Sequence, residues 1–169
     1  DWSSDVCSSD LAQLEAEKRR ADELLHNILP ERVADQLKRK IHPIAERFEA
    51  ATVLFADLAD FTRFAAERAP DAVVELLNDI FSRFDALVDE HGLEKIKTIG
   101  DAYMVVAGIP DPRPDHAAAM AGMALAMRAE FARFAAERGL NLGIRIGLHC
   151  GPVVAGVIGR RKFIYDLCG

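Results

Sequence analysis

Two apolar runs that flank Gly100-Asp101 limit the possible folds of this chain more than any other feature of the sequence. Residues 93–99 and 102–109 each have the length of one strand, and a Gly-Asp pair between two such runs is typical of a tight hairpin turn. Strands joined by a tight turn pair antiparallel. The sequence therefore predicts a sheet that is antiparallel at least around this hairpin.

The remaining pattern combines further strands with long amphipathic helices. Strand-like runs cover 51–58, 141–150, 153–158 and 163–167, and a turn is expected at Gly151-Pro152. Helices are expected over 61–67, from Pro70-Asp71 to His91-Gly92, and from Asp115 to about Arg138, where Gly139 ends the last one. The order β-α-α-β-β-α-β-β predicts an α+β fold with one mostly antiparallel sheet and helices on one face.

The first 42 residues do not share this pattern. Residues 1–11 repeat a Ser-Ser-Asp unit and are interpreted as a segment that is not native to the protein. In residues 12–42 the apolar positions recur at steps of three and four up to Pro30, over about two and a half heptads, and a second short helix is expected over 31–40. Two interpretations stay open: these helices pack on their own domain, or they form a parallel dimer stalk that transmits a signal.

Residues 43–169 are interpreted as one globular domain. The chain ends at Gly169 inside an apolar, glycine-punctuated stretch, so the domain is expected to be incomplete at its C-terminus. The net charge of −6 and the lack of a basic face make nucleic acid an unexpected partner. No apolar stretch approaches the roughly 18–20 residues that span a bilayer, and no signal peptide is visible. A cytoplasmic location is expected, and tethering to a membrane by a missing upstream segment stays open.

The cysteines and two of the histidines give no metal site by their spacing. Cys7, Cys150 and Cys168 are expected to be reduced thiols. His116 and His149 have no ligand partner at a suitable spacing, and both are interpreted as structural. The candidate chemistry therefore rests on carboxylates.

Two aspartates follow strand-like runs. Asp57 directly follows the apolar run Val53-Leu54-Phe55-Ala56, and Asp101 lies in the hairpin turn. Either residue alone is well explained by a helix cap or a turn. Adjacent strands of a small sheet can bring both carboxylates to one edge, where they repel each other unless a cation lies between them. The pair therefore predicts a site for a divalent metal such as Mg²⁺.

Three further features point to a phosphate-containing substrate. A helix begins at Phe61-Thr62, directly after Asp57, and its free N–H groups can bind a phosphate. Arg145 stands in an otherwise apolar strand, where it either extends to solvent along its stem or contacts phosphate. Lys97 alternates with Ile96 and Ile99, so it is expected on the face away from the packed side chains, as a solvated lysine or as a ligand-binding one. Together these residues suggest an enzyme that acts on a metal–nucleotide.

Four ordered segments resemble one known family. VLFADLADFT, EKIKTIGDAYMVVAGIP, IRIGLHCGPVVAGVIG and KFIYDLCG are similar to the motifs of class III nucleotidyl cyclase catalytic domains, and LLHNILPERVADQLK resembles the signalling helix that often precedes such domains. The resemblance implies a ferredoxin-like core and a head-to-tail homodimer with the active site between protomers. It also implies an upstream sensor or membrane domain that is missing from this chain.

The resemblance assigns roles to individual residues. Asp57, Asp101 and the Leu58 carbonyl match the ligands of two Mg²⁺ or Mn²⁺ ions, while Phe61 and Thr62 fall in the phosphate loop and Arg145 matches a phosphate-binding arginine. Lys97 and Asp166 match the base-recognising pair that the partner protomer supplies. Two positions depart from the pattern: Asp60 stands where many members have glycine, and Cys168 stands where an aromatic residue is expected. The transition-state Asn and Arg of the family fall beyond Gly169, so the resemblance implies that the fragment by itself is poorly active or inactive.

The base-recognising pair favours adenine. Lys97 can only donate a hydrogen bond and an ionised Asp166 can only accept one, which suits N1 and the exocyclic amine of adenine. Guanine presents the opposite pattern. The sequence therefore predicts an adenylate cyclase that converts ATP to 3′,5′-cyclic AMP and pyrophosphate. A guanylate cyclase and a non-catalytic, dimerising regulatory module stay open as alternatives.

Overall fold

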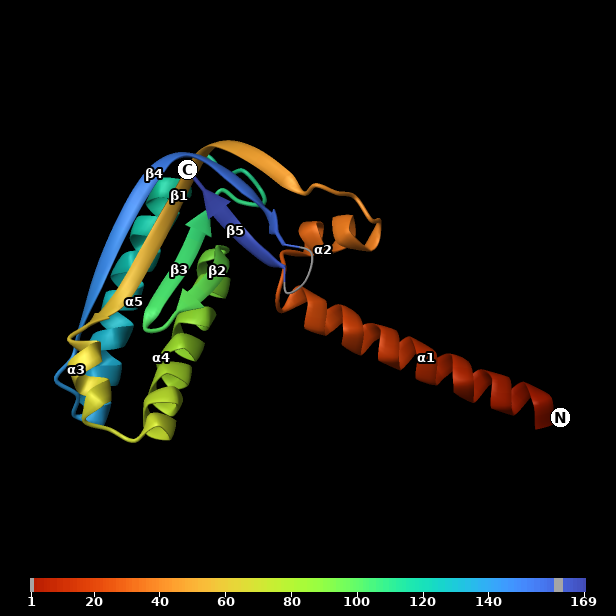
Figure 1. Ribbon diagram of the computed structural model, residues 1–169, viewed down its shortest axis with the longest axis horizontal. Coiled ribbons are helices and arrows are strands. Elements are labelled where there is room, and N and C mark those ends of the chain that lie inside the picture. The colour runs from red at the N-terminus through yellow and green to blue at the C-terminus, as the bar shows by residue number, and fades with distance from the viewer. Residues whose placement is uncertain (1, 160–162) are drawn as a thin grey trace. The chain divides into compact units, whose positions relative to one another are not determined.

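The computed structural model describes residues 2–159 and 163–169, and these residues divide into two compact units with their boundary in the chain between Ile44 and Ala45. The first unit contains helix α1, Trp2–His26, and helix α2, Glu31–Lys38 (Figure 1). The second helix therefore ends at Lys38, earlier than the expected 31–40.

The second unit is built on one sheet. Its described strands are β1, Ala45–Ala59; β2, Glu94–Ile99; β3, Ala102–Ala107; β4, Gly143–Ile158; and β5, Ile164–Cys168. They lie in the order β2-β3-β1-β4-β5, and every neighbouring pair is antiparallel. The predicted hairpin is the β2–β3 pair, and Gly100 in its turn has a φ of +60°.

Three helices complete this unit: α3, Phe61–Ala66; α4, Pro70–His91; and α5, His116–Arg138. Pro70 begins α4, because its fixed φ suits the first helical turn, and Gly92 and Gly139 end α4 and α5 in the left-handed conformation. Figure 1 shows α4 and α5 running along the strands. Their buried side chains contact one face of the sheet. The predicted α+β fold, with helices on one face of an antiparallel sheet, is confirmed.

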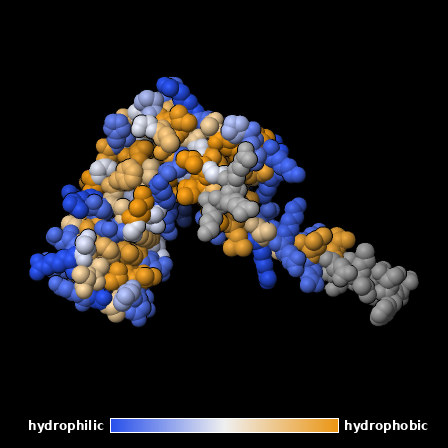
Figure 2. Space-filling model, viewed as in Figure 1, coloured by the Kyte–Doolittle hydropathy of each residue, from blue (hydrophilic) through white to orange (hydrophobic). Residues whose placement is uncertain are grey.

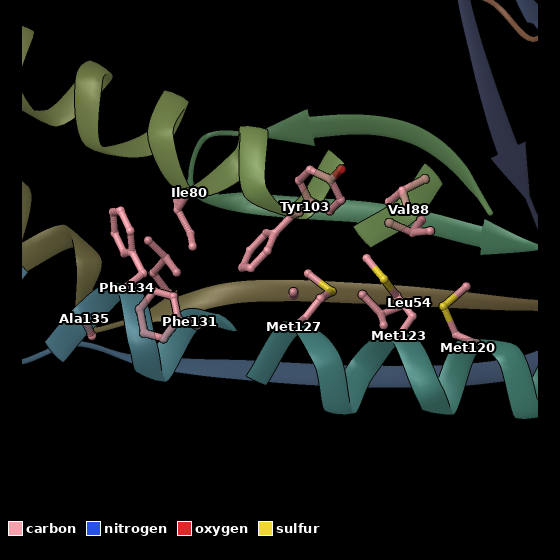
Figure 3. Packing of buried hydrophobic residues seen from close by; sticks show 14 of the residues in the cluster. Leu54, Ile80, Val88, Tyr103, Met120, Met123, Met127, Phe131, Phe134 and Ala135 are labelled. Atoms are coloured by element: carbon pink, nitrogen blue, oxygen red, sulfur yellow. The ribbon is translucent and has the colours of Figure 1, made fainter. Parts of the chain in front are cut away.

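The core lies between the sheet and these two helices. Every second residue of β1 near its end, namely Leu54, Ala56 and Leu58, faces the helices and is buried. Met120, Met123 and Met127 are fully buried on one side of α5 and point toward the strands, while Ile80 and Val88 approach from α4 (Figure 3). The alternation along β1 leaves its other residues, among them Phe55 and Asp57, on the side of the sheet without helices.

Substituting Met123 with Ala is expected to lower the free energy of unfolding by about 2–5 kcal/mol, because a fully buried side chain leaves a cavity in a packed core. Urea denaturation monitored by circular dichroism measures the change. Met123→Leu conserves most of the volume and is the matched control, with an expected loss below about 1.5 kcal/mol. Equal losses in the two variants would contradict this packing.

Two predicted strand boundaries were wrong. The strand expected over 51–58 is the longer β1, and the strands expected over 141–150 and 153–158 are one continuous β4 without a turn at Gly151-Pro152. The β1–β4 register shifts between Phe48 and Ala51, opposite Pro152. A proline cannot donate a hydrogen bond to a ladder, and a bulge in the partner strand is a place where it is tolerated. Pro152 therefore accompanies an irregularity within the strand instead of ending it.

Glu94 at the start of β2 is a half-buried carboxylate with an altered acidity. Burial, together with the charges of Asp111 and Asp89, raises the pKa of Glu94 to about 7 from 4.5. The folded chain thus binds the Glu94 proton more tightly than the unfolded chain does. The stabilising contribution is complete below about pH 4.5 and is lost as the pH rises toward 7.

Glu94→Gln is therefore expected to remove a pH dependence of stability. At pH 8 the variant should be more stable than the parent chain by about 1–2 kcal/mol, once partial solvent screening is included, and near pH 4.5 the two should be similar. Thermal or urea unfolding at several pH values measures the difference. Glu90→Gln on the exposed side of α4 is the control. A difference between Glu94→Gln and the parent that does not change with pH would contradict the assignment.

Hydrophobic residues lie among hydrophilic ones on the surface, as Figure 2 shows for one face. On the sheet side without helices, Phe55 is 48% exposed. On α1 the exposed hydrophobic residues include Leu11, Leu14 and Leu24.

Among the described helices, none combines the length and the apolar character needed to cross a membrane.

Candidate active site

A pocket of about 660 Å³ opens where β1 ends and α3 begins. It brings together most of the residues that the sequence singles out. The residues that line it include Asp57, Leu58, Asp60, Phe61, Thr62, Asp101 and Arg145. Three elements that are distant in the sequence, the end of β1, the β2–β3 turn and the start of β4, therefore supply one site.

Asp57 and Arg145 face each other across the β1–β4 pair. The Nε–H of Arg145 donates a hydrogen bond to Asp57 Oδ1 at 2.7 Å. This bond, followed by the charges of Asp57, Asp60 and Asp101, raises the pKa of Arg145 above its usual value. The Arg145 side chain is 70% exposed and that of Asp57 42%, so the pair contributes at most about 1 kcal/mol to stability. Arg145 can therefore leave Asp57 at little cost.

Asp101 reaches the same pocket from the hairpin turn. Its Oδ2 accepts a hydrogen bond from the backbone N–H of Leu58 at 3.2 Å, which fixes the turn against the end of β1. Asp57 and Asp101 thus lie close together at one end of the strands, where β1 ends and β2 turns into β3, as the strand pattern indicated.

The donor set of the pocket fits a magnesium or manganese ion. Two carboxylates and a main-chain carbonyl are hard oxygen ligands, which Mg²⁺ and Mn²⁺ prefer over the nitrogen and sulfur ligands of zinc. Within the described part of the chain, no three His, Cys, Asp or Glu side chains form a cluster that could hold a metal by itself. An ion at Asp57 and Asp101 would therefore keep positions for water and phosphate oxygens, which is how Mg²⁺ is usually bound beside a nucleotide.

Lys97 and Asp166 form a second polar group. They come from β2 and β5, the two outer strands in the described sheet, and the Lys97 Nζ donates a hydrogen bond to Asp166 Oδ2. Asp166 Oδ1 accepts a second bond from the N–H of Leu167 at 2.9 Å. Both side chains are largely buried, at 30% and 21% exposure. Neither lines the pocket at Asp57.

A bulge in β2 sets the direction of Lys97. The β2–β3 register shifts between Lys95, which lies opposite Val105, and Lys97, which lies opposite Met104. Lys95 therefore lies on the helix side of the sheet, where its Nζ is 2.6 Å from Oδ1 of Asp85 on α4. Lys97 lies on the side without helices, as expected. The grouping of Ile99 with the packed side chains was wrong, because Ile99 is 57% exposed.

Two features were missed by sequence reasoning. An apolar cavity of about 490 Å³ lies on the sheet side without helices, lined in part by Phe55, Met104 and His149. His116 contacts the buried Thr52 at 2.7 Å from Nδ1 to Oγ1, and Thr52 also lies 3.0 Å from Cys150 Sγ. Strand register places Cys150 opposite Thr52, and the packing of α5 on the sheet brings His116 to the same hydroxyl. No spacing in the sequence signals either contact.

The chain is similar to known proteins over most of its length. The family model of the adenylate and guanylate cyclase catalytic domain matches residues 44–169. An adenylate cyclase of Mycobacterium tuberculosis is 49% identical over 159 residues, which cover 94% of this chain and 36% of the relative. The human atrial natriuretic peptide receptor 2 is 46% identical over 156 residues, 90% of this chain and 15% of the receptor. The chain thus spans little more than a third of the mycobacterial relative.

Solved structures show the same fold. The catalytic core of a rhodopsin-guanylyl cyclase with converted specificity, in complex with ATPαS, matches with a TM-score of 0.70 and 38% identity, over 74% of this chain and 68% of that one. The adenylyl cyclase CyaB from P. aeruginosa matches with a TM-score of 0.70 and 26% identity, over 74% and 67%. From residue 44 onward, this chain belongs to the adenylate and guanylate cyclase catalytic domain family.

Proposed function

We propose that this chain is the catalytic domain of an adenylate cyclase, which converts ATP to 3′,5′-cyclic AMP and pyrophosphate. The observation that carries the proposal is the convergence of Asp57, Asp101 and Arg145 on one pocket at the sheet edge. This combination of two carboxylates and one arginine suits a divalent cation and the phosphates that the cation binds.

In the proposed mechanism, Asp57, Asp101 and the Leu58 carbonyl hold two Mg²⁺ or Mn²⁺ ions. When bound, the ions supply the acidity that activates the ribose 3′-hydroxyl and the charge that holds the triphosphate. Arg145 exchanges its bond to Asp57 for the phosphate oxygens and offsets their charge. The backbone at Phe61 and Thr62 donates hydrogen bonds to the phosphates. As the bond from the 3′-oxygen to the α-phosphorus forms and the bond to pyrophosphate breaks, the proton of the 3′-hydroxyl would pass to solvent water.

The proposed choice of base rests on the Lys97–Asp166 pair. Lys97 donates to adenine N1, and Asp166 accepts from the exocyclic amine. Without nucleotide, Lys97 and Asp166 are hydrogen-bonded to each other. In the proposal, the edge of the bound adenine replaces this bond with one hydrogen bond to each side chain.

The proposed enzyme is a head-to-tail homodimer. Lys97 and Asp166 do not line the pocket at Asp57, so a second copy is needed to place its base-recognising pair over the bound nucleotide. Residues 43–169 form the catalytic domain in this proposal, and residues 12–42 form a stalk whose exposed leucines pair with those of the second copy. The stalk connects to an upstream sensor or membrane domain. The free cysteines Cys150 and Cys168 suit the reducing cytoplasm, where we place the domain.

A guanylate cyclase is the second candidate, because guanylyl cyclases are among the similar structures. Binding of ATP and GTP in the presence of Mn²⁺, measured by calorimetry, together with chromatography of the products, separates the candidates. Tighter binding of ATP and formation of cyclic AMP are expected. Tighter binding of GTP would favour the guanylate cyclase. Failure to bind either nucleotide would overturn the proposal in favour of a regulatory module.

A further inference from the structure

We propose that Asp60 is a specificity-determining residue of the pocket, whose negative charge favours the divalent cation and disfavours nucleotide that arrives without one. The inference deepens the proposed function, on which it rests, and concerns a position where the resemblance leads one to expect glycine.

The backbone at Asp60 is unusual. Its φ of +62° and ψ of 16° are left-handed, a conformation that glycine adopts freely and that most other residues avoid. Aspartate tolerates this conformation better than most residues do. An Asp at this position is therefore compatible with the turn between β1 and α3, although it is not the residue that the turn itself favours.

The carboxylate of Asp60 has no structural task that explains it. Asp60 occupies the N-cap position of α3, where an aspartate normally accepts a hydrogen bond from the first helical turn, yet its side chain makes no such bond. Among the described residues, no hydrogen bond or ion pair of this carboxylate is found. Asp60 instead lines the pocket that contains Asp57 and Asp101.

The charge of Asp60 decides the electrostatic balance of the pocket. Three carboxylates line it, those of Asp57, Asp60 and Asp101, together with the guanidinium groups of Arg63 and Arg145. With Asp60 these five side chains carry one net negative charge, and the ion pair of Arg63 with Glu67 makes the surroundings more negative still. The influence of Asp60 on Arg145 is electrostatic, and no direct bond joins the two. A negative lining attracts a cation and repels a triphosphate that has no metal.

Asp60 acts here through space and not as a metal ligand. The described residues contain no cluster of three carboxylates, histidines or cysteines close enough to bind one ion. Because the pocket is open to solvent, removal of this charge is expected to change affinities by roughly three- to ten-fold and not to abolish binding.

One substitution, measured with two ligands, tests the inference, because the two affinities should change in opposite directions. In Asp60→Asn, the affinity for Mn²⁺ without nucleotide, measured by electron paramagnetic resonance, should fall by roughly three- to ten-fold. The affinity for ATP in the presence of EDTA, measured by calorimetry, should rise by a similar factor. Both differences should shrink at high salt, because exposed charges are screened.

Two further variants separate charge from structure. Asp60→Gly also removes the charge, but it relaxes the left-handed backbone, so it should reproduce both affinity changes with an equal or higher Tm. Asp71→Asn makes the same charge change on the exposed first turn of α4 and should alter neither affinity.

Each outcome bears on one proposal. Affinities for Mn²⁺ and metal-free ATP that fall together, or that do not change, would overturn the role of Asp60 while leaving the proposed function intact. A parent chain that binds neither Mn²⁺ nor ATP would overturn the proposed function itself.

Discussion

Asp101→Asn is expected to eliminate Mn²⁺ binding at the pocket and, in a longer chain that includes the transition-state Asn and Arg, to lower kcat for cyclic AMP formation by at least roughly 10³-fold, about 4 kcal/mol in the barrier. Asparagine keeps the shape and the oxygen that accepts the Leu58 N–H, so the hairpin turn stays in place while one of two metal carboxylates is lost. Measurements of Mn²⁺ binding and of product formation under saturating ATP check the result, and the binding readout does not depend on turnover.

Asp57→Asn should be equally inactive but differ in one respect. It removes the negative charge opposite Arg145 but keeps an oxygen that can accept the Arg145 Nε–H, so the charge-assisted bond becomes a weaker neutral one and Arg145 is held less tightly without a metal. Glu75→Gln, an exposed position on α4, is the control for a change of one carboxylate elsewhere. Activity of Asp101→Asn or Asp57→Asn within ten-fold of the parent chain would show that the metal site lies elsewhere.

The double substitution Lys97→Glu with Asp166→Cys is expected to reduce the preference for ATP over GTP by at least roughly 100-fold. A wrong substrate that leaves the buried polar groups of a site unpaired can be rejected by up to about 10⁴–10⁵-fold, and the double substitution removes the pattern that suits adenine. The carboxylate that Lys97→Glu introduces could accept from the N1–H and N2–H of guanine. The ratio of kcat/KM for the two nucleotides is the measurement, because stability and overall activity cancel in it.

The single substitutions are informative controls for this pair. Lys97→Glu alone places two carboxylates together where one ion pair stood, so it should lose stability as well as ATP affinity. Asp166→Cys alone leaves Lys97 without its partner and should mainly lose ATP affinity. If the double variant keeps the ATP preference of the parent chain, the base is recognised by other residues.

The elements of the fold with a strong local signal were predictable. Pro70 and Gly92 mark the ends of α4 and Gly139 the end of α5, because these residues fix the backbone directly. The hairpin at Gly100-Asp101 was predictable for the same reason. The continuity of β4 was not, because Pro152 usually ends a strand and the bulge that accommodates it lies on another strand, between Phe48 and Ala51.

The candidate site shows the same division. The positions of Asp57 and Asp101 at strand ends follow from local pattern, and both lie at the pocket. Asp57 and Arg145 are 88 positions apart in the chain, and their contact depends on the register of β1 against β4. Such long-range registers are set by packing of the whole sheet face. The roles of these residues in metal and phosphate binding stay predictions.

The bulge in β2 has a consequence for the behaviour of the chain at high concentration. β2 is an outer strand in the described sheet, and an outer strand exposes unpaired N–H and C=O groups that can recruit a strand of another molecule. Because the bulge turns Lys95 and Lys97 to opposite sides, ion pairs with Asp85 and Asp166 hold the strand from both faces. An irregular, charged edge of this kind is a poor template for strand addition, so we expect the same lysine that we assign to base recognition to disfavour edge-to-edge aggregation as well.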